Sequence, residues 1–101
     1  MQKTVLVTGA SAGIGQATAI YLAQSGYTVY GAARRVEKMQ ELISYGIKPV
    51  SLDVTNDESI RACVEQIFQE AGRIDILVNN AGFGSYGAKT WRSRMPNISW
   101  R

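Results

Sequence analysis

Histidine is absent from this 101-residue chain, and cysteine occurs only once. The lack of histidine removes the commonest metal ligand and general base, and we expect no metal site. A single cysteine excludes an internal disulfide. We interpret Cys63 as a core thiol rather than a reactive one, because it shares a helical face with apolar residues. These residues are Ile60, Val64, Ile67 and Phe68.

Long apolar runs are missing as well. No stretch approaches the roughly 18 apolar residues that a membrane span requires, and the N-terminus enters a strand pattern without the apolar segment of a signal peptide. A chain of this length has room for one small domain only. We therefore expect a cytoplasmic protein with no membrane partner.

Positive charge is concentrated at one end of the chain. The formal net charge is +3, yet residues 1–87 carry seven Lys or Arg against eight Asp or Glu. Both tryptophans lie in the last fourteen residues, which hold no acid and four cations: Lys89, Arg92, Arg94 and Arg101. Cations attract phosphate and indoles stack on bases, so nucleic-acid binding is one interpretation of this tail. An unpatterned tail is more often disordered, and we expect no nucleic-acid partner.

Short β-branched runs alternate with stretches of helical period over the first 79 residues. Strands are predicted at residues 4–8, 27–32, 48–54 and 75–79. Helices are predicted at 13–26, at 36–46 and from the N-cap Asn56 to Gly72. Connections this short require parallel strands joined by right-handed crossovers. The prediction is an α/β fold, a partial Rossmann-type doubly wound parallel sheet with strand order 3-2-1-4.

Two of the predicted helices have apolar residues at helical spacing. The first helix runs through Ile14, Ala17, Ile20 and Tyr21. The second has Val36, Met39, Leu42 and Ile43 on one side, with Gly46 as its terminator.

The pattern stops after Gly82. Residues 1–87 are therefore assigned to one dinucleotide-binding half-domain, and residues 88–101 to a disordered basic tail without secondary structure. The strand at 75–79 would then be an open sheet edge, and a single helix would cover one face of the sheet. Exposed apolar surface of this kind favours self-association through the sheet edge.

The turn after the first strand reads TGASAGIG, residues 8–15. Glycines at positions 9, 13 and 15 allow a tight turn, close approach of backbone N–H groups to a pyrophosphate, and close packing of the helix on the strand. An ordinary glycine-rich turn is the alternative interpretation.

Three features at matching places resemble the short-chain dehydrogenase/reductase family. They are the Gly-x-x-x-Gly-x-Gly turn preceded by Thr8, the Asp53-Val54 pair after the third strand, and Asn-Asn-Ala-Gly at 79–82 after the fourth. The resemblance covers about residues 3–87, the N-terminal cofactor-binding part of the family. It implies an NAD(P)(H)-dependent oxidoreductase that transfers hydride between nicotinamide and a carbonyl or alcohol substrate.

The resemblance also implies where a nicotinamide dinucleotide would bind. Its diphosphate and nicotinamide-side ribose would be lined by Gly9, Ser11, Gly13, Ile14 and Gly15. The positive end of the helix dipole at this turn favours an anion.

The adenosine end of the dinucleotide would lie after the third and fourth strands. Asp53 would hydrogen-bond the adenine amino group, with the Val54 backbone beside it. Asn80, Ala81 and Gly82 would border the adenosine ribose. A solvated strand-end carboxylate is the alternative interpretation of Asp53.

The choice of cofactor depends on the end of the second strand. NAD-binding relatives place an acid there for the 2′-hydroxyl, whereas this chain has Ala33 followed by Arg34 and Arg35. A guanidinium pairs bidentately with a 2′-phosphate, so we predict NADP(H) rather than NAD(H). A solvated arginine pair that opens a helix is the alternative.

The catalytic residues of the family are missing. Its members use a Tyr as acid/base, a Lys four residues later and a Ser, but no Tyr-x-x-x-Lys occurs here. The pairs Tyr86/Lys89 and Tyr45/Lys48 are spaced by three. We assign no catalytic residue and expect the chain to be inactive alone. A stand-alone or partner-complemented dinucleotide-binding module is the alternative.

The family usually continues at this point with an acidic helical segment. One permitted back-translation of residues 89–101, read in a neighbouring frame, gives an amphipathic segment of that kind. A frameshift after about residue 88 explains the lost periodicity, the charge jump, the clustered tryptophans and the abrupt ending together. We therefore interpret the chain as a truncated member of the family.

Overall fold

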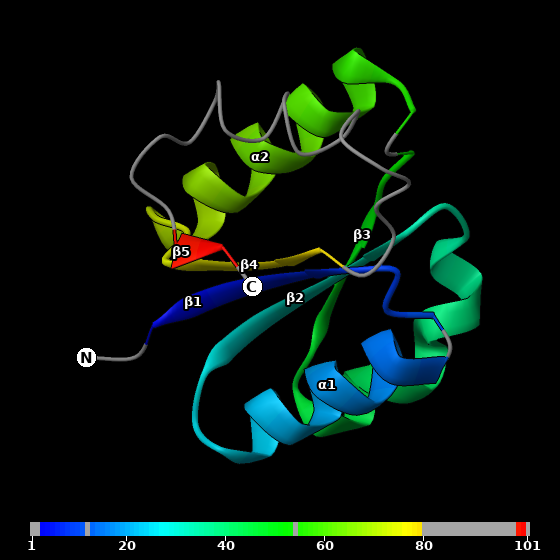
Figure 1. Ribbon diagram of the computed structural model, residues 1–101, viewed down its shortest axis with the longest axis vertical. Coiled ribbons are helices and arrows are strands. Elements are labelled where there is room, and N and C mark those ends of the chain that lie inside the picture. Colours follow the sequence, from blue (N-terminus) through cyan, green and yellow to red (C-terminus); the bar gives the residue numbers. More distant parts are fainter. Residues whose placement is uncertain (1–2, 12, 54, 80–98, 101) are drawn as a thin grey trace.

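The computed structural model describes residues 3–11, 13–53, 55–79 and 99–100, and it forms one parallel sheet with helices on both faces (Figure 1). The strands are β1 (Thr4–Thr8), β2 (Thr28–Ala33), β3 (Lys48–Ser51), β4 (Ile76–Asn79) and β5 (Ser99–Trp100). The helices are α1 (Gly13–Gln24), the 3-10 helix η1 (Val36–Tyr45) and α2 (Asp57–Ala71). The strand order is β3-β2-β1-β4-β5. The predicted α/β class and the order 3-2-1-4 are thereby confirmed.

The sheet is buried on both faces, as parallel sheets are. Along β1, Leu6 belongs to the core under α2, while Val5 and Val7 belong to the core on the opposite face. Figure 1 shows α2 on one side of the sheet and α1 and η1 on the other. Among the described residues, a single helix therefore covers one face, as expected.

Helix α2 begins and ends where the sequence indicates. The Asn56 side chain caps its first turn, and Gly72 ends it in the left-handed conformation at φ 79°. Cys63 is buried in the core under this helix, so its interpretation as a core thiol is confirmed. Phe68, however, is 42% exposed. About 3.6 residues per turn place it at the margin of the buried stripe rather than within it.

Helix η1 differs from the predicted α-helix. It is a ten-residue 3-10 helix, and about three residues per turn align positions i and i+3 on one face. Met39 and Leu42 are buried and Val36 packs against the same core. The prediction that Ile43 shares this face is wrong, because the tighter helix rotates it outward to 49% exposure. The predicted terminator Gly46 is confirmed at φ 85°.

Helix α1 buries small residues most deeply. Gly15 and Ala19 are its buried residues, whereas Ile14 and Tyr21 are 78% and 69% exposed. Small side chains let the helix axis approach the sheet closely, and Ile20 and Leu22 pack against the same core while partly buried. Of the apolar positions along this helix, Ile14, Ala17 and Tyr21 are exposed and Ile20 packs against the core.

The strand β5 corrects two expectations about the end of the chain. Ser99 and Trp100 pair in parallel with Ile76 and Leu77 of β4, so β4 is not wholly an open edge and residues 88–101 are not wholly without structure. Unpaired N–H and C=O groups on a sheet edge accept any extended segment, whatever its side-chain period. The remainder of the predicted tail, residues 88–98 and 101, lies outside the described residues.

Candidate functional site

The carboxyl ends of the parallel strands bring most of the predicted site residues to one edge of the sheet (Figure 1). The chain leaves β1 into the glycine turn, β2 into Arg34 and Arg35, and β3 toward Asp53. Backbone bonds tie these segments together: Ala10 N donates to Ala32 O at 3.1 Å, and Leu52 N donates to Ala33 O at 2.9 Å. The topology thus gathers three segments that are far apart in the sequence.

The glycine turn has the backbone geometry that its residues predict. Gly9 and Gly13 have φ values of 64° and 63°, a region that residues with a Cβ rarely adopt. A Cβ on Gly15 would lie 2.1 Å from the Gly9 carbonyl oxygen, so the start of α1 can touch the turn only if residue 15 is glycine. The turn therefore presents backbone at the N-terminus of α1, where the helix dipole favours an anion.

The end of β2 carries two cations beside a small residue. Ala33 is buried at the strand end and pairs with Ser51 of β3. Arg34 and Arg35 follow and are exposed. Hydrogen bonds from Thr55 lower the pKa of the Asp53 carboxyl, and the charge of Arg34 lowers it further. Both arginines are thus on the surface next to the strand ends, and the Asp53 carboxylate lies close enough to Arg34 to interact with its charge.

Asp53 is held by residues that the sequence interpretation missed. Its Oδ1 accepts hydrogen bonds from Thr55 Oγ1 at 2.6 Å and from Thr55 N at 3.0 Å. Its backbone N–H donates to Ser59 Oγ at 2.9 Å. The bonds from Thr55 are the main cause of the lowered pKa of Asp53. A hydroxyl residue two positions after an Asp is the pattern of a local side-chain turn, and it could have indicated Thr55.

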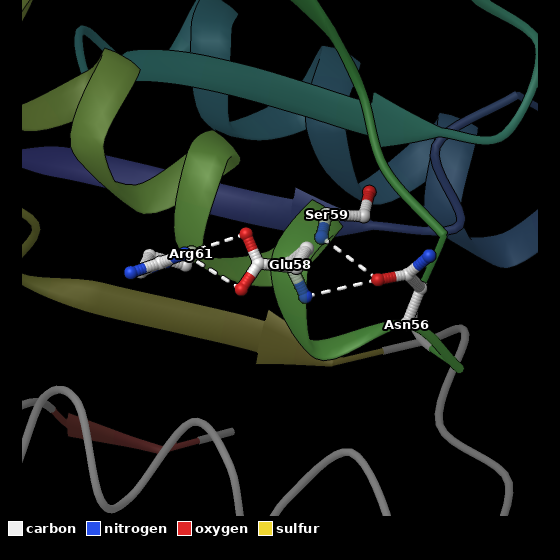
Figure 2. A network of polar contacts seen from close by, with 4 residues as sticks. All are labelled: Asn56, Glu58, Ser59 and Arg61. Carbon is white, nitrogen blue, oxygen red and sulfur yellow. Dashed lines mark hydrogen bonds and ion pairs between the residues drawn. The ribbon is translucent and has the colours of Figure 1, made fainter.

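A separate set of contacts positions the start of α2 (Figure 2). Asn56 Oδ1 accepts from the backbone N–H groups of Glu58 at 2.9 Å and Ser59 at 3.2 Å. Arg61 pairs with the Glu58 carboxylate one turn along. The cap satisfies two N–H groups that have no partner within the helix, so α2 starts at a defined place next to Asp53.

Four of the predicted cofactor-binding residues lie outside the described residues: Val54, Asn80, Ala81 and Gly82. The pair Tyr86/Lys89, to which no role is assigned, also lies outside them. Lys48 begins β3, at the opposite edge of the sheet, with its Nζ 5.4 Å from the ring centroid of Tyr30. This contact gives Lys48 a structural cation–π role.

In the described part of the chain, no group of three or more His, Cys, Asp or Glu side chains gathers in a way that could hold a metal ion. No helix in those segments is long and apolar enough to cross a bilayer.

Comparison with known protein families gives a match over nearly the whole chain. Residues 3–99 match the family described as short chain dehydrogenase. A 3-ketodihydrosphingosine reductase of Bacteroides thetaiotaomicron is 48% identical over 86 residues, which are 85% of this chain and 30% of that protein. The chain thus spans about a third of the length of the curated relatives it matches.

Solved structures share the fold as well as the sequence. A short-chain dehydrogenase from Streptomyces avermitilis superposes with a TM-score of 0.77 at 42% identity, covering 81% of this chain and 31% of that one. An alcohol dehydrogenase from the archaeon Thermococcus sibiricus, solved in complex with 5-hydroxy-NADP, superposes with a TM-score of 0.70 at 30% identity, covering 77% and 36%. Each similarity is confined to about a third of the longer chain.

Proposed function

Because this chain belongs to the short-chain dehydrogenase family, we propose that it is the cofactor-binding part of an NAD(P)(H)-dependent oxidoreductase. The observation that carries the proposal is the glycine turn at the N-terminus of α1, where a Cβ at residue 15 would collide with Gly9 O at 2.1 Å. Such a turn lets the backbone approach a diphosphate. A bound nicotinamide would supply the hydride-transfer chemistry, between its own ring and a carbonyl or alcohol substrate.

The proposed contacts follow the three segments at the strand ends. The diphosphate and the nicotinamide-side ribose would be held by Gly9, Ser11, Gly13, Ile14 and Gly15. Ile14 is exposed, which supports the proposal that it contacts the bound dinucleotide.

The adenine amino group would be bound by Asp53, with the Val54 backbone beside it. The adenosine ribose would be bordered by Asn80, Ala81 and Gly82. For Asp53, support comes from its place at the same sheet edge as the glycine turn, next to β2.

We propose NADP(H) as the preferred cofactor over NAD(H). The small Ala33 leaves no carboxylate to bind a 2′-hydroxyl, and the exposed Arg34 and Arg35 offer guanidinium groups to a 2′-phosphate. The 5-hydroxy-NADP in the Thermococcus sibiricus structure agrees with this choice. We further propose that the chain alone is not catalytic, because it contains no Tyr-x-x-x-Lys.

A titration of the purified chain tests the cofactor proposal. NADPH should bind about tenfold or more tightly than NADH, as measured by calorimetry, because one bidentate phosphate contact contributes on this scale. Arg34→Gln with Arg35→Gln should remove most of the preference. Lys38→Gln, which also removes an exposed cation next to this segment, is the matched control and should retain it. Equal affinity for NADPH and NADH in the unaltered chain would refute the NADP(H) assignment.

A chimaera tests the oxidoreductase proposal. Residues 1–82 of this chain would be joined to the remaining C-terminal part of the Bacteroides thetaiotaomicron reductase, which shares 48% identity over the matched region. The chimaera should oxidise NADPH in the presence of the ketone that the relative reduces, and the 101-residue chain should not. A folded chimaera that neither binds nor oxidises the cofactor would refute the proposal. Binding by the chain without turnover by the chimaera would favour a dinucleotide-binding module.

A further inference from the structure

The loop between β3 and α2 fixes Asp53 at three separate groups. Its amide donates to Ser59 Oγ at 2.9 Å, and its carbonyl accepts from Asn56 N at 3.0 Å. Its carboxylate accepts twice from Thr55, at 2.6 Å and 3.0 Å, and both bonds end on Oδ1. Backbone and side chain are therefore both oriented before any ligand arrives.

Engagement of one carboxylate oxygen by Thr55 leaves the other with a defined direction. A carboxylate rotates about its last side-chain torsion, which is broad when nothing holds it. Two bonds to Oδ1 restrict this rotation, so that Oδ2 is the oxygen not engaged by Thr55. The same bonds lower the pKa of Asp53, so the group is an ionised carboxylate near neutral pH and accepts hydrogen bonds only.

We propose that Thr55 is a positioning residue that directs Asp53 Oδ2 toward a 6-amino purine and thereby selects adenine against 6-oxo purines. The inference rests on the proposed function, in which Asp53 faces the adenine. An exocyclic amino group donates to a carboxylate oxygen, whereas a 6-oxo group would place two acceptors against each other. A preoriented acceptor loses less rotational freedom on binding, which strengthens discrimination.

The surroundings of the Thr55 hydroxyl do not require it for the stability of the fold. The N-terminus of α2 is capped by Asn56, which binds the Glu58 and Ser59 amides (Figure 2). The Thr55 side chain is exposed, so removal of its hydroxyl leaves no cavity. The contact that would be lost is the 2.6 Å bond to Asp53.

The test compares two dinucleotides that differ only at purine position 6. NADPH and its hypoxanthine analogue are titrated calorimetrically into the 101-residue chain, into Thr55→Val, which loses the hydroxyl, and into Thr55→Ser, which keeps it. The unaltered chain and Thr55→Ser should prefer NADPH about tenfold, since a hydrogen bond to a charged group contributes on that scale. Thr55→Val should lose most of this ratio by weakening NADPH binding alone.

A double substitution separates positioning from general destabilisation. In an Asp53→Ala background, Thr55→Val should change neither affinity, because no carboxylate remains to be oriented. An unchanged ratio in Thr55→Val, or an equal loss for both dinucleotides, would overturn the inference while leaving the proposed function intact. Binding of neither dinucleotide by the unaltered chain would overturn the proposed function, and this inference with it.

Discussion

Residues at the carboxyl ends of the strands have different roles from residues at the amino ends. At the carboxyl ends, glycines and Asp53 shape a surface that can receive a ligand. At the amino ends, Asp75 Oδ2 accepts from Thr4 N at 2.8 Å and pairs with Arg73 Nε at 2.8 Å. This contact joins Asp75, just before β4, to Thr4 at the start of β1, 71 residues away in sequence. It stabilises the sheet at the amino ends of its strands, opposite the proposed site.

Gly15→Ala should destabilise the chain and weaken dinucleotide binding. The added Cβ would lie 2.1 Å from Gly9 O, and relief of the overlap must move α1 away from the turn. We expect a loss of about 1–3 kcal/mol in the free energy of unfolding, measured in urea. Gly13→Asn is the control, because nothing lies within 4 Å of a Cβ at that position and Asn tolerates left-handed backbone. Equal losses for the two variants would contradict the steric explanation.

Asp75→Asn should make the free energy of unfolding depend less on pH. Arg73 is the main cause of the lowered pKa of Asp75, and Thr4 N and Lys3 also contribute. A carboxyl with a lowered folded-state pKa contributes stability above its unfolded pKa of about 3.9 and loses that contribution as pH falls through the folded value. The variant should therefore be about 1 kcal/mol less stable at pH 7.

Urea unfolding at low pH tests the direction of this effect of pH on stability. Between about pH 5 and pH 2 the unaltered chain should lose this advantage, and its urea midpoint should approach that of Asp75→Asn. Glu41→Gln, at an exposed carboxylate of η1, is the control with the same change of charge. A difference between the unaltered chain and Asp75→Asn that persists unchanged at low pH would contradict this account.

At the scale of elements, the two helical segments after β2 follow different geometries. Helix α2 has a capped start, a left-handed glycine at its end and a buried stripe of α-helical period. Segment η1 has the same kind of glycine terminator but a 3-10 geometry. Apolar residues at positions 36, 39, 42 and 43 fit either helix type, because they include spacings of both three and four. Packing on the sheet decided between them.

The geometry of η1 predicts unequal effects for two adjacent residues. Leu42 is 1% exposed and Ile43 is 49% exposed. Leu42→Ala should lower the free energy of unfolding by about 2–5 kcal/mol, whereas Ile43→Gln should change it by no more than about 0.5 kcal/mol. Chemical denaturation of both variants would measure this. A loss at Ile43 similar to that at Leu42 would show that the segment packs as an α-helix.

At the scale of the whole molecule, apolar surface remains between α1 and the sheet. A groove of about 560 Å³ is lined by Ala17, Thr18, Tyr21, Leu22, Tyr27, Ile76 and Val78. A doubly wound sheet has its faces covered by helices, and the chain spans about a third of its relatives' length. We propose that this surface, together with the part of the β4 edge beyond its pairing with β5 at Ile76 and Leu77, favours self-association when the 101-residue chain is alone.

Tyr21→Lys should reduce that self-association. Tyr21 is 69% exposed and lines the groove, so a charge there places a strongly hydrated group on the apolar surface. We expect the association constant to fall about tenfold in sedimentation velocity, equivalent to about 1.4 kcal/mol. Gln24→Lys adds the same charge at an exposed position of α1 that does not line the groove. An equal effect of both variants would assign the change to net charge instead.

The sequence by itself determined the fold class, the order of the first four strands and the location of the glycine turn. These depend on local signals: β-branched runs, glycine stops, the Asn56 cap and short connections that permit only parallel strands. The role of Cys63 as a core residue was also predictable, because its neighbours at helical spacing are apolar.

Tertiary structure alone decided the features that depend on distant partners. The 3-10 form of η1, the outward positions of Ile14, Ile43 and Phe68, and the pairing of Ser99 and Trp100 with β4 all follow from what each segment meets in space. The bond from Asp53 N to Ser59 belongs to the same class, because it depends on how α2 packs beside β3, whereas the Asp53–Thr55 turn is local and has a recognisable sequence pattern. Local periodicity is a property of the chain, whereas burial and hydrogen-bond partners are properties of its packing.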